Sequence, residues 1–182
     1  MTTNNTRYSS LVIGLHWFIF LLMIAIYATM EFRGIFERGS DPRELMKTIH
    51  FMLGASLLFL VVIRIAARIF STTPEILPAL KPHLKILSKL MHLALYSLMI
   101  AMPISGWLIL NAHGKAVPFF GLELPILITE NKALGEQLHE LHEIGAKLGY
   151  ALIGLHTAAA LFHHYIMKNN VLLRMSFLKI KS

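Results

Sequence analysis

Cysteine is missing from this 182-residue chain, and charged residues are scarce. Without thiols the chain forms no disulfides, holds no cysteine-ligated iron–sulfur cluster, and cannot attach a haem covalently through a C-x-x-C-H motif. Only 15% of the residues are charged, whereas 55% are hydrophobic. The apolar residues lie in long blocks separated by short charged segments, which is the composition of a membrane protein.

Four apolar blocks approach or exceed the length of about 20 residues that a helix needs to cross a bilayer. They are Leu11–Met30, Ile49–Phe70, Leu90–Leu110 and roughly Leu148–Met167. We therefore predict an all-α integral membrane protein: one domain over 1–182, with transmembrane helices at approximately 9–31, 43–70, 83–110 and 136–167. The first block is too long for a signal-peptide core and lacks a convincing cleavage site, so we expect it to stay in the mature protein.

The net charge of +7 is distributed unevenly along the chain. If both termini share one side, that side holds ten basic residues and one acidic residue, Glu75, whereas the other side holds seven basic and nine acidic residues. The positive-inside rule then predicts that both termini are cytoplasmic. The basic excess is better explained as a topology signal in contact with membrane lipid than as a nucleic-acid patch, so we expect no nucleic-acid partner.

The predicted fourth helix, 136–167, carries histidines at two depths. His142 and His156 are fourteen residues apart, so on a helix they lie within about 40° of one face and about 21 Å apart along the axis. Gly149 lies midway on the same face, where a missing side chain would let a flat macrocycle or another helix approach closely. Gly145 and Gly149 also form a G-x-x-x-G pair, so simple helix packing is an open alternative.

The predicted topology gives each of these histidines a partner at the same depth. His16 lies in the inner half of the first helix, near the level of His156, and His50 lies in the outer part of the second helix, level with His142. A single membrane histidine is more often a hydrogen-bonded core residue or part of a proton path than a ligand. Two depth-matched pairs weaken that alternative, and the 21 Å separation argues against one compact zinc site.

Two separated haems, each clamped by two histidines, explain the spacing best. The expected fold is therefore a four-transmembrane-helix bundle enclosing two b-type haems, with non-covalent bis-histidine coordination. Iron with both axial positions filled is suited to passing single electrons. The two levels together predict an electron path through the bilayer.

Four segments of the chain resemble the prokaryotic cytochrome b561 family: "HWFIFLLMIAIYATMEFRGIF", the helix around His50, "MHLALYSLMIAMPISG" and "HELHEIGAKLGYALIGLHTAAALFHHYIMKNNVLLRM". The resemblance covers nearly the whole chain. It implies iron ligands at His16 and His156 for the inner haem, and at His50 and His142 for the outer haem, in a bacterial inner membrane. It further implies a superoxide oxidase, which takes electrons from superoxide on the periplasmic side and reduces ubiquinone in the membrane.

A group of basic residues precedes His50 in the outer connection: Arg33, Arg38, Arg43 and Lys47. A local positive field of this kind could attract a small anion such as superoxide. The alternative is a solvated loop in which Glu31, Glu37, Asp41 and Glu44 neutralise these charges.

Quinone reduction takes up protons as well as electrons, and histidine can relay a proton or hydrogen-bond a quinone carbonyl. His92 and His163, near the inner level, are our candidates for this role. The alternative is hydrogen bonding to haem propionates or to neighbouring helices.

Two other functions stay open on the sequence alone. The chain could be a cytochrome b anchor subunit that accepts electrons from a docked dehydrogenase or hydrogenase, although its short tails and four spans favour a stand-alone enzyme. A haem-free, histidine-lined metal transporter is the third reading. The physiological donor, superoxide or another one-electron donor, and the formation of a homodimer are not decided by the sequence.

Overall fold

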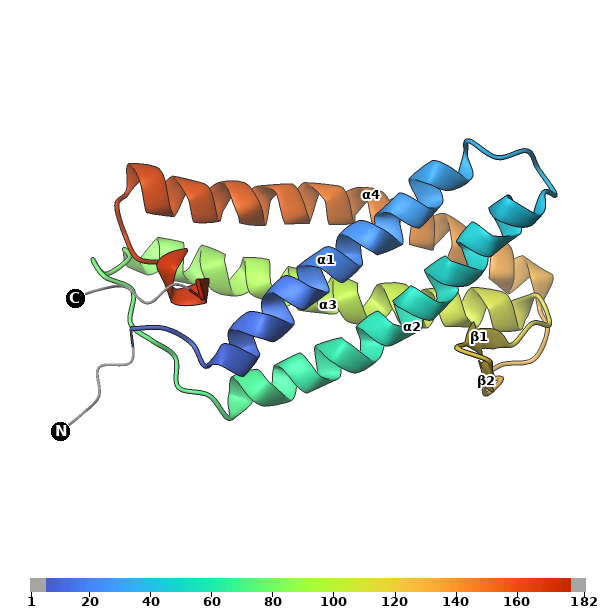
Figure 1. Ribbon diagram of the computed structural model, residues 1–182, viewed down its shortest axis with the longest axis horizontal. Coiled ribbons are helices and arrows are strands. Elements are labelled where there is room, and N and C mark those ends of the chain that lie inside the picture. The colour runs from blue at the N-terminus through green and yellow to red at the C-terminus, as the bar shows by residue number, and fades with distance from the viewer. Residues whose placement is uncertain (1–5, 178–182) are drawn as a thin grey trace.

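The computed structural model describes residues 6–177 and is a bundle of four long helices (Figure 1). The helices are α1 (Ser10–Arg33), α2 (Asp41–Ile69), α3 (Pro82–Ala112) and α4 (Lys132–Leu161). A π-helical turn, Phe162–Ile166, continues α4, and a short 3-10 turn, Leu173–Met175, follows it. All four helices are long and apolar enough to cross a membrane, with mean hydropathies of 2.4, 2.2, 1.9 and 1.3 in chain order.

Local sequence signals set the helix ends. Ser9 caps α1 by accepting a hydrogen bond from the backbone of Val12, and the side chain of Asn131 caps α4 in the same way through Leu134. Prolines stand in the first turns of α2 and α3, where the missing amide hydrogen is not needed. The fourth helix begins at Lys132 rather than at the expected Glu136, because Asn131 supplies a cap that the apolar pattern alone does not reveal.

Helix packing leaves most of the apolar surface facing outward. The cluster of buried residues at the contact of α1 and α2 consists of Ile19, Leu22, Leu57 and Val61. In the 18-residue apolar stretch of each helix, no more than 22% of the residues are buried. Large apolar side chains cover the outside, as expected for helices whose outer faces contact lipid.

The two ends of the bundle differ in structure. A β-hairpin lies at the end opposite the termini, formed by β1 (Val117–Phe119) and β2 (Leu122–Leu124) in antiparallel register (Figure 1). Its turn residues Phe120 and Gly121 both have positive φ, which suits the tight turn of a two-residue hairpin. The sequence analysis expected helices only, so this small sheet is an addition to the predicted fold.

The other end carries the first and last described residues. The segment around the 3-10 turn lies against the start of α1: Tyr8 donates its amide hydrogen to Arg174 O at 3.1 Å, and Trp17 Nε1 donates to Met175 O at 2.8 Å. We call this end the inner end and the hairpin end the outer end, from the predicted topology.

Candidate functional site: two histidine pairs

The outer pair joins α2 to α4. The imidazole rings of His50 and His142 have centroids 6.3 Å apart, with planes at 73°. Both side chains are partly buried between the helices. The depth match expected from the sequence is therefore realised as a direct juxtaposition of two rings.

Hydrogen bonds fix the orientation of both outer rings. His50 Nδ1 lies 3.2 Å from Ile26 O and 3.2 Å from Thr29 Oγ1, whose own hydrogen is donated to Ile26 O. Ser105 Oγ donates to Met102 O and lies 2.8 Å from His142 Nδ1, from which it accepts. Each Nδ1 therefore carries the ring hydrogen, and each Nε2 is left with a free lone pair suited to metal ligation.

The inner pair joins α1 to α4. The centroids of His16 and His156 are also 6.3 Å apart, with planes at 71°, so the two pairs have nearly identical geometry. A third imidazole stands beside them: the ring of His92, on α3, lies 5.6 Å from that of His156. His92 Nδ1 donates to Ser88 O at 2.7 Å, which leaves its Nε2 as a hydrogen-bond acceptor.

The separation within each pair fits an axially ligated haem. Two imidazoles that bind one metal ion from opposite sides are separated by two metal–nitrogen bonds of about 2 Å each and by the distance from each nitrogen to its ring centroid. This sum is close to the observed 6.3 Å between the centroids. Both partners on α4 lie on one uninterrupted helix, so the two levels are about 21 Å apart. Within residues 6–177, no three histidine, aspartate or glutamate side chains converge on a common metal position. At each level two imidazoles from different helices face each other, as axial ligation of a planar macrocycle requires, and His92 stands beside the inner two.

Gly149 lies between the two histidine levels, and the side chain of Tyr27 on α1 packs against it. A Cβ at this glycine would collide with Tyr27 Oη and would lie 3.1 Å from Leu98. Tyr27 donates its hydroxyl hydrogen to Ala146 O at 2.9 Å, and its ring stacks against Tyr150 at 4.2 Å. The close approach expected at Gly149 is thus made by a neighbouring helix, and a contact of Gly149 with haem stays a prediction.

The basic residues of the outer connection have different partners. Arg43 Nη1 donates to Arg33 O and Phe36 O, and Lys47 pairs with Glu44 at 2.5 Å. Arg33 and Arg38 form no ion pair with a carboxylate in the described part of the chain. Arg33 is close enough to act electrostatically on His50. Arg43 and Lys47 are therefore bound to neighbouring groups of the outer connection, whereas Arg33 and Arg38 have no carboxylate partner among residues 6–177.

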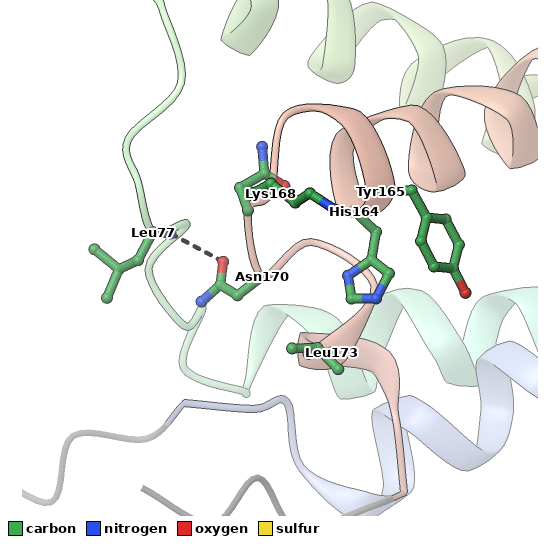
Figure 2. A pocket seen from close by; sticks show the side chains of 7 residues that line it. Leu77, His164, Tyr165, Lys168, Asn170 and Leu173 are labelled. Atoms are coloured by element: carbon green, nitrogen blue, oxygen red, sulfur yellow. Dashed lines mark hydrogen bonds between the residues drawn. The ribbon is translucent and has the colours of Figure 1, made fainter.

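A cavity of about 430 Å³ opens at the inner end, below the π-helical turn (Figure 2). It is lined by Leu77, His164, Tyr165, Lys168, Asn169, Asn170 and Leu173. His163 adjoins it through Asn169, whose Nδ2 donates to His163 Nδ1 at 3.0 Å. Since Nδ1 accepts this bond, the neutral ring carries its hydrogen on Nε2. His164 Nδ1 is buried and has no hydrogen-bond partner among residues 6–177.

The residues that fix the histidine rings were missed by sequence reasoning. Thr29 and Ser105 are hydroxyl residues within apolar blocks, and Arg64 is a charged residue within one. Arg64 Nη2 lies 3.3 Å from His16 Nδ1, and Nη1 donates to Val12 O at 3.0 Å. A polar residue in a membrane helix signals a buried partner, which could have identified these three.

Proteins similar to this chain carry the names of cytochromes and of a superoxide oxidase. Residues 7–177 match the family described as prokaryotic cytochrome b561. A Yersinia pestis protein named "Probable superoxide oxidase CybB" is 40% identical over 169 residues, which is 93% of this chain and 95% of the relative. "Cytochrome b561 homolog 1" of Escherichia coli (strain K12) is 36% identical over 93% of this chain and 96% of its own length. "Cytochrome b561 homolog 2" of the same strain is 30% identical over 96% and 95%, respectively.

These matches support the electron-transfer role of a membrane cytochrome b, an oxidoreductase that binds b-type haem. The four apolar helices agree with a multi-pass protein of the inner membrane. With the family match covering nearly the whole length, the chain belongs to the prokaryotic cytochrome b561 family.

Proposed function

We propose that this protein is a superoxide:ubiquinone oxidoreductase with two b haems, one bound by His50 and His142 and the other by His16 and His156. The observation that carries the proposal is the near identity of the two pairs, with 6.3 Å between ring centroids in each. Haem held by two histidines supplies one-electron oxidation and reduction, because no open axial position is left for another ligand.

His156 has two imidazole neighbours, so the inner ligand pair needs a further argument. The His16 and His156 rings match the outer pair in centroid spacing, at 6.3 Å, whereas the His92 ring is nearer to His156, at 5.6 Å, with a similar interplanar angle. The equal spacing favours His16 as the second ligand. His92 is exposed and keeps Nε2 as an acceptor, which suits a proton relay beside the inner site.

The outer end is the proposed site for superoxide. Arg33 and Arg38 have no carboxylate partner in the described part of the chain, so their charges are available to attract an anion. Arg43 and Lys47 add to the local field, although Arg43 is bound to backbone carbonyls and Lys47 to Glu44. The name of the Yersinia pestis relative supports superoxide as the donor.

The inner end is the proposed site for ubiquinone. The 430 Å³ cavity falls within the usual size range of small-molecule pockets, about 300–1,000 Å³. His163 adjoins it with a hydrogen on Nε2, ready to donate to a quinone carbonyl. His92 and His163 are thus proposed to bind the quinone or to deliver its protons.

The orientation in the inner membrane follows from the charges. Eight of the ten basic residues of the predicted inner side lie within residues 6–177, with Glu75 as their acidic counterpart. By the positive-inside rule this end faces the cytoplasm, so superoxide oxidation is periplasmic.

Stopped-flow visible spectroscopy on the purified protein tests the proposal. Haem is first quantified per chain, and the protein is then exposed to a superoxide pulse followed by ubiquinone. We expect two haems per chain, rapid reduction by superoxide and reoxidation by the quinone. Slow reduction by superoxide would leave the electron path intact and point to a docked donor protein, whereas absence of haem would refute the ligand assignment.

A further inference from the structure

Arg64 is a charged residue in the apolar part of α2, and its guanidinium lies beside the inner histidine pair. One nitrogen donates to Val12 O at 3.0 Å, and the other lies 3.3 Å from His16 Nδ1. The ring of His156 lies 6.3 Å from that of His16 and 5.6 Å from that of His92, so the guanidinium borders a cluster of three imidazoles. A charge within a membrane helix is expensive and usually serves a function.

The protein itself does not neutralise this charge. Among residues 6–177, no carboxylate forms an ion pair with Arg64. Arg68, one turn further along α2, has the same sign and is bound to Thr73 and Tyr8. The inner pair therefore lies in the field of an uncompensated positive charge.

In the outer pair, hydrogen-bond acceptors rather than a guanidinium face the Nδ1 atoms. Oxygen atoms of Ile26 and Thr29 face His50 Nδ1, and Ser105 Oγ faces His142 Nδ1. Hydrogen-bond acceptors at this position make an imidazole a stronger electron donor to a metal, which stabilises the oxidised metal. Arg33 acts on His50 from a distance, but it makes no hydrogen bond to the ring within the described residues.

We infer that Arg64 keeps the reduction potential of the inner haem above that of the outer haem, so that electrons run downhill from the outer end to the inner end. Ferric haem carries one positive charge more than ferrous haem, and a fixed cation nearby therefore favours the reduced form. In the structure the guanidinium can only donate, so His16 Nδ1 accepts its hydrogen bond and the hydrogen of the neutral ring lies on Nε2. Coordination through Nε2 would require that hydrogen to move to Nδ1 or to be lost, and in either case the positive charge of Arg64 stays beside the ring. The inference rests on the proposed ligand pairs.

A spectroelectrochemical titration of the purified holoprotein tests it, with Arg64→Gln, Arg64→Lys and the matched control Arg68→Gln. We expect R64Q to shift one of the two haem transitions to lower potential and to leave the other in place. R64K should keep most of the wild-type potential, because it keeps the charge. R68Q should shift the transition much less, because Arg68 bonds to Thr73 and Tyr8 instead of approaching His16. A His50→Gln background, which retains only the inner haem, identifies the transition that moves.

A second variant keeps Arg64 in place and removes only its charge effect. Arg68→Glu places a carboxylate four residues from Arg64 on the same helix, where the two can pair. Relative to R68Q, R68E should also lower the inner potential, and this comparison holds even if R64Q fails to retain the inner haem.

An unchanged or raised inner potential in R64Q and R68E, with two haems still bound, would overturn the inference and leave the proposed function standing. A raised potential would mean that Arg64 instead stabilises an anionic imidazolate ligand. Absence of haem in the wild-type protein would be a failure of the proposed function, and haem quantification before each titration separates the two cases.

Discussion

At the scale of single residues, the hydrogen on a histidine ring decides what the ring can do. His50 and His142 have oxygen acceptors at Nδ1, so both rings leave Nε2 unprotonated. His163 accepts a hydrogen bond at Nδ1 and therefore has the opposite arrangement. Local contacts thus suit the two outer rings to binding a metal through Nε2, whereas His163, like His16 beside Arg64, has a donor at Nδ1.

The ligand assignment predicts a stepwise loss of haem. His142→Gln removes one outer ligand and should reduce the haem content from two per chain to one, and His16→Gln should do the same at the inner site. A pyridine haemochrome assay on purified variants measures the ratio. His83→Gln, on an exposed residue at the start of α3, should retain both haems. Two haems in both ligand variants would show that other residues hold them.

Ser105 is predicted to support the outer site without contacting its metal. Ser105→Ala leaves the Nδ1 hydrogen of His142 without its acceptor, and losing a contact of this kind typically lowers metal affinity about 10–100-fold. A haem-transfer titration to apomyoglobin should therefore empty the outer site of S105A first. Ser56→Ala is the matched control, because Ser56 Oγ bonds only to Met52 O. Equal haem loss from S105A and S56A would contradict this role.

At the scale of helices, α1 and α4 meet through a tyrosine that fits against a glycine. Tyr27 crosses from α1 to bond Ala146 O and occupies the space over Gly149, while Tyr150 on α4 donates to Glu31 on α1 at 2.8 Å. These contacts lie between the two histidine levels. They fix α1, which carries His16, against α4, which carries His142 and His156.

Gly149→Ala should therefore destabilise the bundle. Its methyl group collides with Tyr27 Oη, and overpacking of this kind costs about 1–3 kcal/mol. Tyr27→Phe removes the colliding oxygen and should restore part of the loss in the double variant. Gly154→Ala, where a Cβ meets nothing within 4 Å, should be neutral or slightly stabilising. Thermal unfolding in detergent, followed by the Soret band, measures the four variants. If G149A melts like G154A, the close fit at Gly149 is unimportant for stability.

The apolar blocks and the histidine spacing were sufficient to predict four helices and the matched levels of His16 with His156 and of His50 with His142, because helical rise and bilayer thickness are fixed quantities. The same patterns did not predict how each helix is rotated about its own axis. The third imidazole at His156, the guanidinium at His16 and the tyrosine over Gly149 all depend on which faces meet, and periodicity of a lipid-exposed helix carries little information about this.

The connections were predicted least well. The hairpin consists of two three-residue strands, too short for an alternating pattern, and it is held by the aromatic contact of Phe119 with Phe59 at 5.7 Å. Buried Asn111 anchors the same connection by accepting a hydrogen bond from Leu127 N at 2.8 Å. Such contacts join residues distant in sequence, so no local signal announces them.

At the scale of the whole molecule, the absence of cysteine makes the orientation directly testable. Ala79→Cys lies in the exposed connection on the inner end, and Thr129→Cys in the exposed connection on the outer end. A membrane-impermeant maleimide added to intact cells should label T129C and leave A79C unlabelled until the membrane is permeabilised. The opposite pattern would reverse the proposed sides for superoxide and ubiquinone.

The placement of one histidine from each pair on α4 has a consequence for biosynthesis. The fourth helix is the last to leave the ribosome, and it supplies a partner to both His16 and His50. Neither pair can be completed before α4 has been synthesised, so on the proposed ligand set a chain terminated before α4 has no bis-histidine site at either level. Haem loading then becomes a late step of maturation, and failed synthesis products cannot carry redox-active iron into the membrane.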